Sequence, residues 1–181
     1  MKNKWKKKLQ LFSFILIIIS SFFVTGCTTL EEEKERVVNK KSILDEIDSS
    51  DSGKLSCTRD AFATGVTVDL KYELEYKDGN VLLLHSMEQV ISDDEDKLDE
   101  YETTYRNIAK NYKELKYYDI NIIRDEDSVL NDTVINYAKL DMDKLLDIEG
   151  EEDNIIVDGK VALKDWVLFA EKFGTVYEKV E

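Results

Sequence analysis

The sequence predicts an α+β domain, in which an antiparallel sheet of four to five strands, in the order ββαββα, carries its helices on one face. Three observations predict it. Residues 66–76 alternate between apolar and polar side chains, which is the period of a half-buried strand. Asp78-Gly79 then supplies a two-residue turn, and hairpins exclude an all-parallel sheet. Apolar residues between positions 98 and 115 recur every three or four positions, as on one face of a helix.

The first predicted hairpin joins residues 66–76 to the apolar run that follows Gly79. Its buried side is expected to carry alternate residues of the first strand: Val66, Val68, Leu70, Tyr72, Leu74 and Tyr76. A regular register gives four opposed pairs: Tyr76 with Val81, Leu74 with Leu83, Tyr72 with His85, and Leu70 with Met87. This register places His85 on the inner face of the sheet.

A long helix is predicted after the first hairpin. Ser92, with Glu95 three residues later, has the pattern of a capping box, and Asp93 and Asp94 suit the first turn. One apolar stripe follows: Leu98, Tyr101, Tyr105, Ile108, Tyr112 and Leu115. Such a stripe suits a helix that lies across a sheet.

The second half of the domain repeats the pattern of a hairpin followed by helices. Alternation predicts one strand through Tyr118, Ile120 and Ile122 and another through Thr133, Ile135 and Tyr137, with the turn at residues 124–127. Asp141 is expected to cap a short helix through Met142, Leu145 and Leu146. Residues 163–173 predict a last helix, with Gly174 directly after it, and residues 175–180 predict a final edge strand.

The N-terminal segment has the pattern of a signal peptide. Residues 2–8 hold five lysines, and an apolar run of fourteen residues without a charge follows, from residue 11 to residue 24. A membrane-spanning helix needs about 20 apolar residues, so this run is short for one. An uncleaved N-terminal anchor remains an alternative.

The run ends in Val24-Thr25-Gly26-Cys27, which resembles the lipobox of bacterial lipoproteins. The resemblance implies a diacylglyceryl group on the Cys27 sulfur and cleavage between Gly26 and Cys27. The alternative is an ordinary secretory signal with a chance cysteine. With lipid on Cys27, we expect the protein at the cell membrane, lipid-anchored and facing outside the cytoplasm.

The chain therefore divides into a signal peptide (1–26), a lipidated N-terminus with a polar tether (27–53) and an α+β lipoprotein domain (54–181). The net charge is −14, and removal of residues 1–26 leaves 20 basic and 39 acidic residues, a net charge of −19. Such a domain repels nucleic acid and anionic lipid surfaces. We expect no nucleic-acid partner, and we expect membrane attachment through the lipid anchor alone.

Few residues are candidates for catalysis. His85 is the only histidine, and Cys57 is the only cysteine besides Cys27. We expect His85 to be a hydrogen-bonded histidine inside the sheet rather than a general base. We expect Cys57 to be a small buried residue, with pairing to another chain as the alternative. No enzymatic activity and no cofactor are expected.

Metal binding has weak support. The acidic runs 125–127 and 151–153 are typical of solvated loops. The nearest EF-hand pattern, residues 48–59, puts Arg59 where a bidentate glutamate is needed. No metal site is predicted, although unspecific divalent binding by the acidic surface stays possible. Tyr101, Tyr105 and Tyr112 with Trp166 are expected in the core, and lining a pocket is the alternative.

Three segments resemble the YehR-like lipoproteins, small bacterial lipoproteins built on a domain of unknown function. They are "GVTVDLKYELEYKDGN", "VINYAKLDMDKL" and "FAEKFGTVYEKVE". Residues 137–141 are similar to the D-Y-x-K-A-D run of that family, and the resemblance covers residues 55–181 and the lipobox. The acidic loop at residues 150–154 fits the pattern less well. The resemblance implies an α+β fold outside the cytoplasm and brings no catalytic residues.

Two functions follow as hypotheses. The first is a non-enzymatic binding or interaction domain at the cell envelope, with a protein, peptide or envelope component as its partner. The second is a small-ligand or cation-binding lipoprotein associated with a transporter. A concave pocket on one face of the sheet would favour the second hypothesis.

Overall fold

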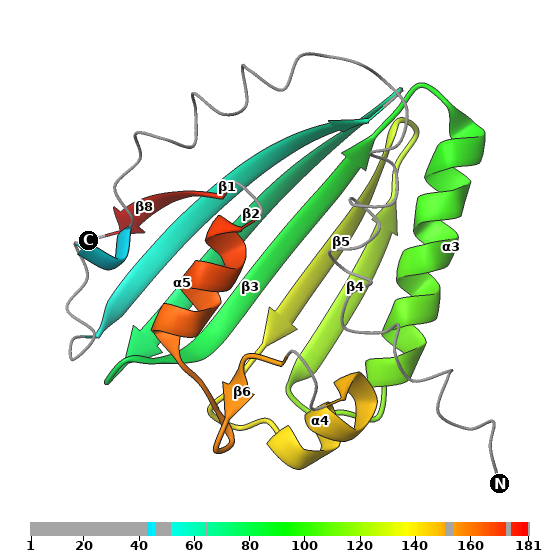
Figure 1. The fold of residues 1–181 in the computed structure, drawn as a ribbon. Coiled ribbons are helices and arrows are strands. Elements are labelled where there is room, and N and C mark those ends of the chain that lie inside the picture. The colour runs from blue at the N-terminus through cyan, green and yellow to red at the C-terminus, as the bar shows by residue number, and fades with distance from the viewer. Residues whose placement is uncertain (1–42, 46–51, 64, 151–153, 173–174, 181) are drawn as a thin grey trace, which may run out of the picture.

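The computed structural model describes residues 43–45, 52–63, 65–150, 154–172 and 175–180 (Figure 1). The predicted signal peptide, Gly26, Cys27 and most of the predicted tether lie outside these residues. Among the described residues, no helix is long and apolar enough to cross a membrane.

One sheet organises the domain. Its six strands are β1 (Gly53–Ala63), β2 (Val66–Lys77), β3 (Asn80–Ile91), β4 (Tyr118–Arg124), β5 (Ser128–Ile135) and β8 (Val176–Val180). They lie in the order β4-β5-β3-β2-β1-β8, and every neighbouring pair is antiparallel. A separate small hairpin pairs β6 (Ile156–Val157) with β7 (Lys160–Val161).

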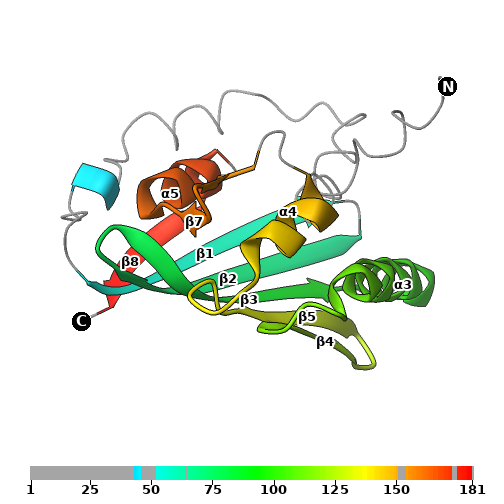
Figure 2. The ribbon, with the colours of Figure 1, turned by 90° about the horizontal axis from the view of Figure 1, so that it is seen from below.

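The helical elements are the 3₁₀ turn η2 (Ile43–Asp45), α3 (Glu95–Tyr112), α4 (Met142–Glu149) and α5 (Leu163–Glu171). Inner-face residues of β2 belong to both hydrophobic clusters of the domain: Val66 lies in the cluster that contains Leu98 of α3, and Tyr76 lies in the cluster that contains Trp166 of α5. Figure 2 shows α4 and α5 on the same side of the sheet. The α+β class, the antiparallel sheet and the placement of the helices are thus confirmed.

The sheet has one strand more than the upper end of the predicted range, because β1 was not predicted. Leu55 and Cys57 of β1 are buried, but the next inward position holds Arg59. That polar residue interrupts the alternation on which a strand prediction depends. The predicted last edge strand is present as β8, and it pairs with β1 at the edge of the sheet.

The first hairpin has the predicted turn and a different register. Asp78 and Gly79 have φ of 50° and 71°, as a type I′ turn requires, and Tyr76 does face Val81. A β-bulge follows, in which Leu82 has no partner in β2. Beyond it Leu74 faces Leu84, so the predicted pairing with Leu83 is wrong by one residue.

The bulge also corrects the position of His85. A shift of one residue turns every later side chain of β3 to the opposite face. His85 faces Glu73 instead of Tyr72, lies on the outer face, and keeps 32% of its side chain exposed. Its Nε2 lies 2.6 Å from Asp132 Oδ1, so it is hydrogen-bonded as expected but not inside the sheet. Ser86 and Glu88 take the inward positions that the prediction gave to His85 and Met87.

The long helix begins later than predicted. Asp94 is its N-cap, and Asp94 Oδ1 accepts a hydrogen bond from the backbone N–H of Asp96 at 3.1 Å. The hydroxyl of Ser92 accepts from the N–H of Asp94 and donates to the carbonyl of Gly65. Ser92 therefore ties the helix entry to the loop between β1 and β2 and is not the cap.

The remaining elements agree with prediction apart from two positions. Arg124 ends β4 instead of opening the turn, and Tyr137 lies beyond β5, in a turn where the N–H groups of Lys139 and Leu140 donate to the carbonyl of Asn136. Strands β4 and β5 pair from Tyr118–Ile135 to Arg124–Val129, and residues 125–127 form the turn. Asp141 caps α4 by accepting from the N–H of Lys144 at 3.2 Å. Helix α5 ends at Glu171, and the predicted C′ residue Gly174 lies outside the described residues.

Candidate functional site

The inner face of the sheet carries a polar band between two apolar regions. The band consists of two neighbouring rows of residues that are in register across β1, β2, β3 and β5. One row is Arg59, Leu70, Glu88 and Asn131, and the other is Cys57, Tyr72, Ser86 and Thr133. The rows on either side are apolar: Leu55, Leu74, Leu84 and Ile135, and Ala61, Val68, Val90 and Val129. Polar groups beneath covering helices cost free energy unless they find partners, so this band marks the part of the face that folding alone does not explain.

The band separates the two hydrophobic clusters of the domain. Helix α3 covers one cluster through Leu98 and Tyr105, and α5 covers the other through Trp166 and Val167. Tyr72 packs against both clusters. Helices α3 and α5 therefore cover different parts of the sheet, on either side of the polar band.

A cavity of about 120 Å³ opens at this place. Its floor is the sheet, with Arg59, Ser86, Asn131 and Thr133 among the lining residues. Its sides come from the end of α3, from α4, from the segment through Asn154, and from α5. Thr133 Oγ1 donates to Asn131 Oδ1 at 3.0 Å within the floor.

Aromatic rings form much of the wall. Tyr72 and Trp166 meet edge to face, with 5.4 Å between ring centroids and 82° between ring planes. Tyr112 and Tyr118 stack with 4.4 Å between centroids. Rings in these arrangements present both apolar faces and polar edges to a bound molecule.

Glu149 is the carboxyl of the cavity. It ends α4, accepts a hydrogen bond from the Tyr112 hydroxyl at 3.2 Å, and accepts one from Asn154 Nδ2 at 3.3 Å. Burial raises the pKa of Glu149 from its ordinary 4.5 to about 8, although these two hydrogen bonds act in the opposite direction. The carboxyl is therefore largely protonated near neutral pH.

Glu88 is a second buried carboxyl in the band, only 3% exposed. Burial raises its pKa to about 7, and the neighbouring Tyr105 hydroxyl and the positive charge of Arg59 draw the pKa back down. The Tyr105 hydroxyl lies beside the carboxyl but lacks the geometry of a well-formed hydrogen bond. Arg59 and Glu88 thus balance part of each other's charge inside the fold.

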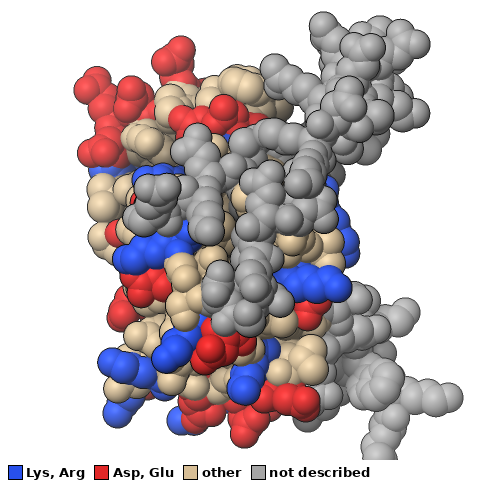
Figure 3. Space-filling view, turned by 90° about the vertical axis from the view of Figure 1, so that its left-hand side faces the viewer, with Lys and Arg blue, Asp and Glu red and all other residues tan. Residues whose placement is uncertain are grey.

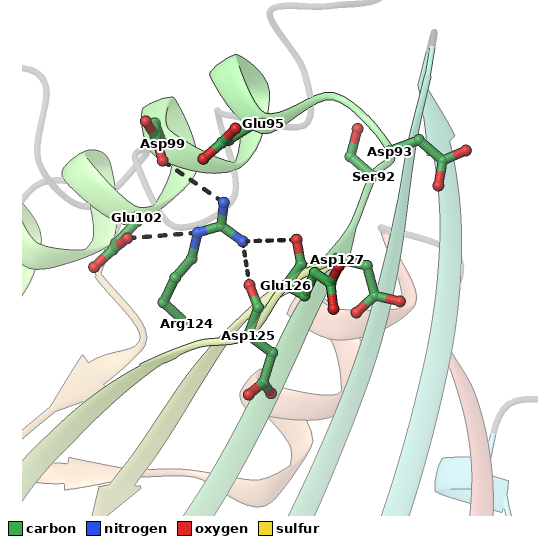
Figure 4. A pocket seen from close by; sticks show the side chains of 9 residues that line it. All are labelled: Ser92, Asp93, Glu95, Asp99, Glu102, Arg124, Asp125, Glu126 and Asp127. Carbon is green, nitrogen blue, oxygen red and sulfur yellow. Dashed lines mark hydrogen bonds and ion pairs between the residues drawn. The ribbon is translucent and has the colours of Figure 1, made fainter.

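A wider hollow lies elsewhere, between the start of α3 and the turn after β4 (Figure 4). Arg124 occupies it: its guanidinium lies 3.7 Å from both Asp99 and Glu102 and also donates to the carbonyl oxygens of Asp125 and Glu126. The residues of the turn, 125–127, are exposed, as expected of a solvated loop.

The carboxylates of the acidic hollow do not form a metal-binding cluster in the described structure. In the part of the chain that the structure describes, no three His, Cys, Asp or Glu side chains converge in a way that could hold an ion. On the face seen in Figure 3, acidic and basic side chains are interspersed, without a continuous basic patch among the described residues. The acidic run 151–153 lies outside the described residues.

Several predicted positions can now be placed. Cys57 is buried, with 1% exposure, and burial raises the pKa of its thiol to about 12. Tyr112 and Trp166 line the cavity, whereas Tyr105 lies in the other cluster, with Tyr101 packed against it. Both alternatives for these aromatic residues thus occur, two as cavity wall and two as core.

Sequence reasoning missed the polar floor. Ser86, Glu88 and Asn131 follow strand positions whose inward direction depends on the bulge at Leu82 and on strand pairing. No local signal in the sequence marks that bulge. Arg59 carries one signal, a charged residue two positions after buried Cys57, but the sequence pattern alone relates it only to a calcium loop that lacks its glutamate.

The fold and the cavity define a class of domain: a six-stranded antiparallel sheet with helices on one face and a small polar-floored cavity between them. The Escherichia coli YehR protein, solved by NMR, has a similar fold, with a TM-score of 0.52 and 16% identity over 72% of this chain and 94% of that chain. An NMR structure of a Streptococcus pneumoniae protein matches at a TM-score of 0.46 and 13% identity, over 85% of this chain and 97% of that chain. No family model and no curated protein matches the sequence. The chain therefore has a YehR-like fold.

Proposed function

We propose that this chain is a lipoprotein of the YehR-like family, anchored by acyl chains on Cys27 at the outer side of the cell membrane, whose domain is a non-enzymatic binding module. The likeness of fold to YehR and the lipobox pattern Val24-Thr25-Gly26-Cys27 support the family assignment. Of the two modes of binding expected from the sequence, the cavity favours a small ligand over a protein partner.

The observation that carries this choice is the pairing of a cavity with a polar floor. Binding sites for small molecules are concave and mostly apolar, with a few polar groups that orient the ligand. Here aromatic walls surround Ser86, Asn131 and Thr133 on the rigid inner face of the sheet. Because apolar groups of the same shape can replace a buried hydrogen-bonded pair at little or no cost in stability, stability alone does not require polar residues at these positions.

Binding is tested with Trp166, which lines the cavity and is one of two tryptophans in the chain. Trp5 lies in the predicted signal peptide, so all tryptophan fluorescence comes from Trp166 in the processed chain and in a Trp5→Phe variant of the unprocessed chain. A panel of neutral and charged small metabolites, with Ca²⁺ and Mg²⁺, is titrated against this fluorescence and against thermal unfolding. A saturable change in both supports the proposal; no change for any compound contradicts it.

The anchor is tested separately. Labelled palmitate is expected to enter the protein in a bacterial host that processes lipoproteins and to be absent from a Cys27→Ser variant. Two acyl chains hold a protein stably at a bilayer, so the variant is also expected to leave the membrane fraction. Labelling that persists in Cys27→Ser contradicts the anchor without bearing on the cavity.

A further inference from the structure

The floor of the cavity offers hydrogen-bond donors that the fold does not use. Thr133 Oγ1 donates a hydrogen bond to Asn131 Oδ1. This bond orients the Asn131 amide and leaves its NH₂ group available as a donor. Within the described residues, neither the Asn131 Nδ2 nor the Ser86 hydroxyl has a hydrogen-bond partner. Asn131 is only 8% exposed, and its Nδ2 is not one of the fully buried atoms without a partner, so this donor is open to the cavity, where a ligand oxygen can accept from it.

The charged groups of the cavity already have counterparts. Glu149 accepts hydrogen bonds from Tyr112 and Asn154, and the charge of Arg59 acts on Glu88. An anion would approach an acidic domain, of net charge −19 after removal of residues 1–26, and a cation would meet the positive charge of Arg59 and the donors of the floor. Because a charge that enters a buried site without a partner is strongly disfavoured, this balance selects an uncharged ligand.

The volume limits the size of the ligand. The cavity measures about 120 Å³. An engineered protein cavity of about 150 Å³ takes benzene, so the present cavity suits one small ring or an aliphatic body of the same size. The edge-to-face and stacked rings of its wall favour a flat body.

These three observations converge on one ligand class. Resting on the proposed binding function, we propose that the cavity takes a small uncharged molecule of single-ring size, whose one carbonyl or hydroxyl oxygen accepts hydrogen bonds from Asn131 and Ser86. The ring lies against Tyr72 and Trp166, and the polar head points to the sheet. The Asn131–Thr133 hydrogen bond is the positioning contact that presents the amide to the ligand.

The test uses four probes of similar size: phenol, toluene, benzoate and benzylamine. Their binding to the full chain is measured by saturation-transfer NMR and by calorimetry. Phenol is expected to bind in a saturable way. Toluene, which lacks the oxygen, is expected to bind about 5-fold more weakly, and the two charged probes at least about 10-fold more weakly.

Variants test the floor. Asn131→Leu keeps the volume and removes the donor, so the preference for phenol over toluene is expected to disappear while toluene still binds. Ser86→Ala is a smaller change and is expected to weaken the binding of phenol about 3-fold. It replaces Asn131→Leu as the test of the floor if that variant does not fold. Asn121→Leu is the matched control, because Asn121 is exposed on β4 and faces Asp132 across the strands.

Each possible result of these measurements supports or overturns a stated part of the inference. Equal binding of phenol and toluene to the unaltered chain overturns the role of Asn131 and Ser86. Tighter binding of benzoate or benzylamine overturns the uncharged class. Failure of all four probes overturns the inference; if Trp166 fluorescence still responds to another compound, the proposed binding function survives it.

Discussion

The Tyr112 hydroxyl, at the end of α3, donates a hydrogen bond to Glu149 Oε1 at the end of α4, with 3.2 Å between the two oxygens. This contact joins residues 37 positions apart in the sequence and links two helices at the side of the cavity. It holds a carboxyl whose pKa burial raises to about 8. The helices that cover the sheet are therefore linked through a group that titrates near physiological pH.

This raised pKa makes stability depend on pH. A carboxyl with a higher pKa in the folded chain than in the unfolded chain binds its proton more tightly when folded. The stabilisation is complete below the ordinary pKa of 4.5 and is lost as pH rises through about 8. We expect the free energy of unfolding to fall over this range by on the order of 2 kcal/mol from Glu149, with Glu88 acting in the same direction up to about pH 7.

Urea unfolding at a series of pH values measures the effect. Glu149→Gln keeps the shape and cannot ionise, so it is expected to flatten the dependence between pH 4.5 and 8 and to leave the part due to Glu88. Glu114→Gln is the control, because the Glu114 side chain is 90% exposed. An unchanged slope in Glu149→Gln shows that this carboxyl does not titrate as described.

Trp166 is expected to be the most sensitive wall residue for stability. It is 5% exposed, meets Tyr72 edge to face, and belongs to the larger hydrophobic cluster. Trp166→Ala should lower the free energy of unfolding by about 3–5 kcal/mol, since it removes a buried ring and enlarges the cavity. Chemical denaturation measures this change.

The matched control for this substitution is Leu168→Ala on the same helix, where the side chain is 40% exposed. It should cost less than about 1 kcal/mol. Similar losses in both variants would mean that α5 contributes through helix formation and not through the packing of Trp166 on the sheet.

The fold was predictable where local patterns decide it. The alternation from Val66 to Tyr76 and the Asp78-Gly79 turn correctly gave the first hairpin, and the capping oxygen of Asp141 correctly gave the start of α4. In each case one short stretch of sequence contains the physical cause of the structure. The helical stripe from Leu98 to Tyr112 likewise identified the face of α3 that is buried.

The site was not predictable because it depends on relations between strands. Leu82 bulges out of the β2–β3 ladder, and this single unpaired residue turns Ser86 and Glu88 inward and His85 outward. Nothing in the apolar run around Leu82 distinguishes a bulge from a regular strand. Asn131 joins the floor only through its pairing with Glu88, a contact between residues 43 positions apart.

The cap of α3 gives a test of the corrected helix start. Asp94→Ala removes the oxygen that accepts from the N–H of Asp96, so the free energy of unfolding should fall by about 1 kcal/mol. Asp93→Ala, at the exposed neighbouring position, should change it by less than about 0.5 kcal/mol. Thermal or urea unfolding measures both changes. A larger loss of stability in Asp93→Ala than in Asp94→Ala would show that Asp93, and not Asp94, caps the helix.

Cys57 is the last group whose behaviour the structure determines. It is 1% exposed on the inner face of β1, and burial raises the pKa of its thiol from 9.0 to about 12. Because only the thiolate reacts with alkylating reagents, the shift alone should slow labelling by about 10³-fold relative to an ordinary thiol at the same pH. In a Cys27→Ser chain, where Cys57 is the sole cysteine, iodoacetamide labelling followed by mass spectrometry should be very slow in buffer and fast in urea. Rapid labelling of the folded chain, or a disulfide-linked dimer on a non-reducing gel, would instead favour the alternative in which this thiol pairs with another chain.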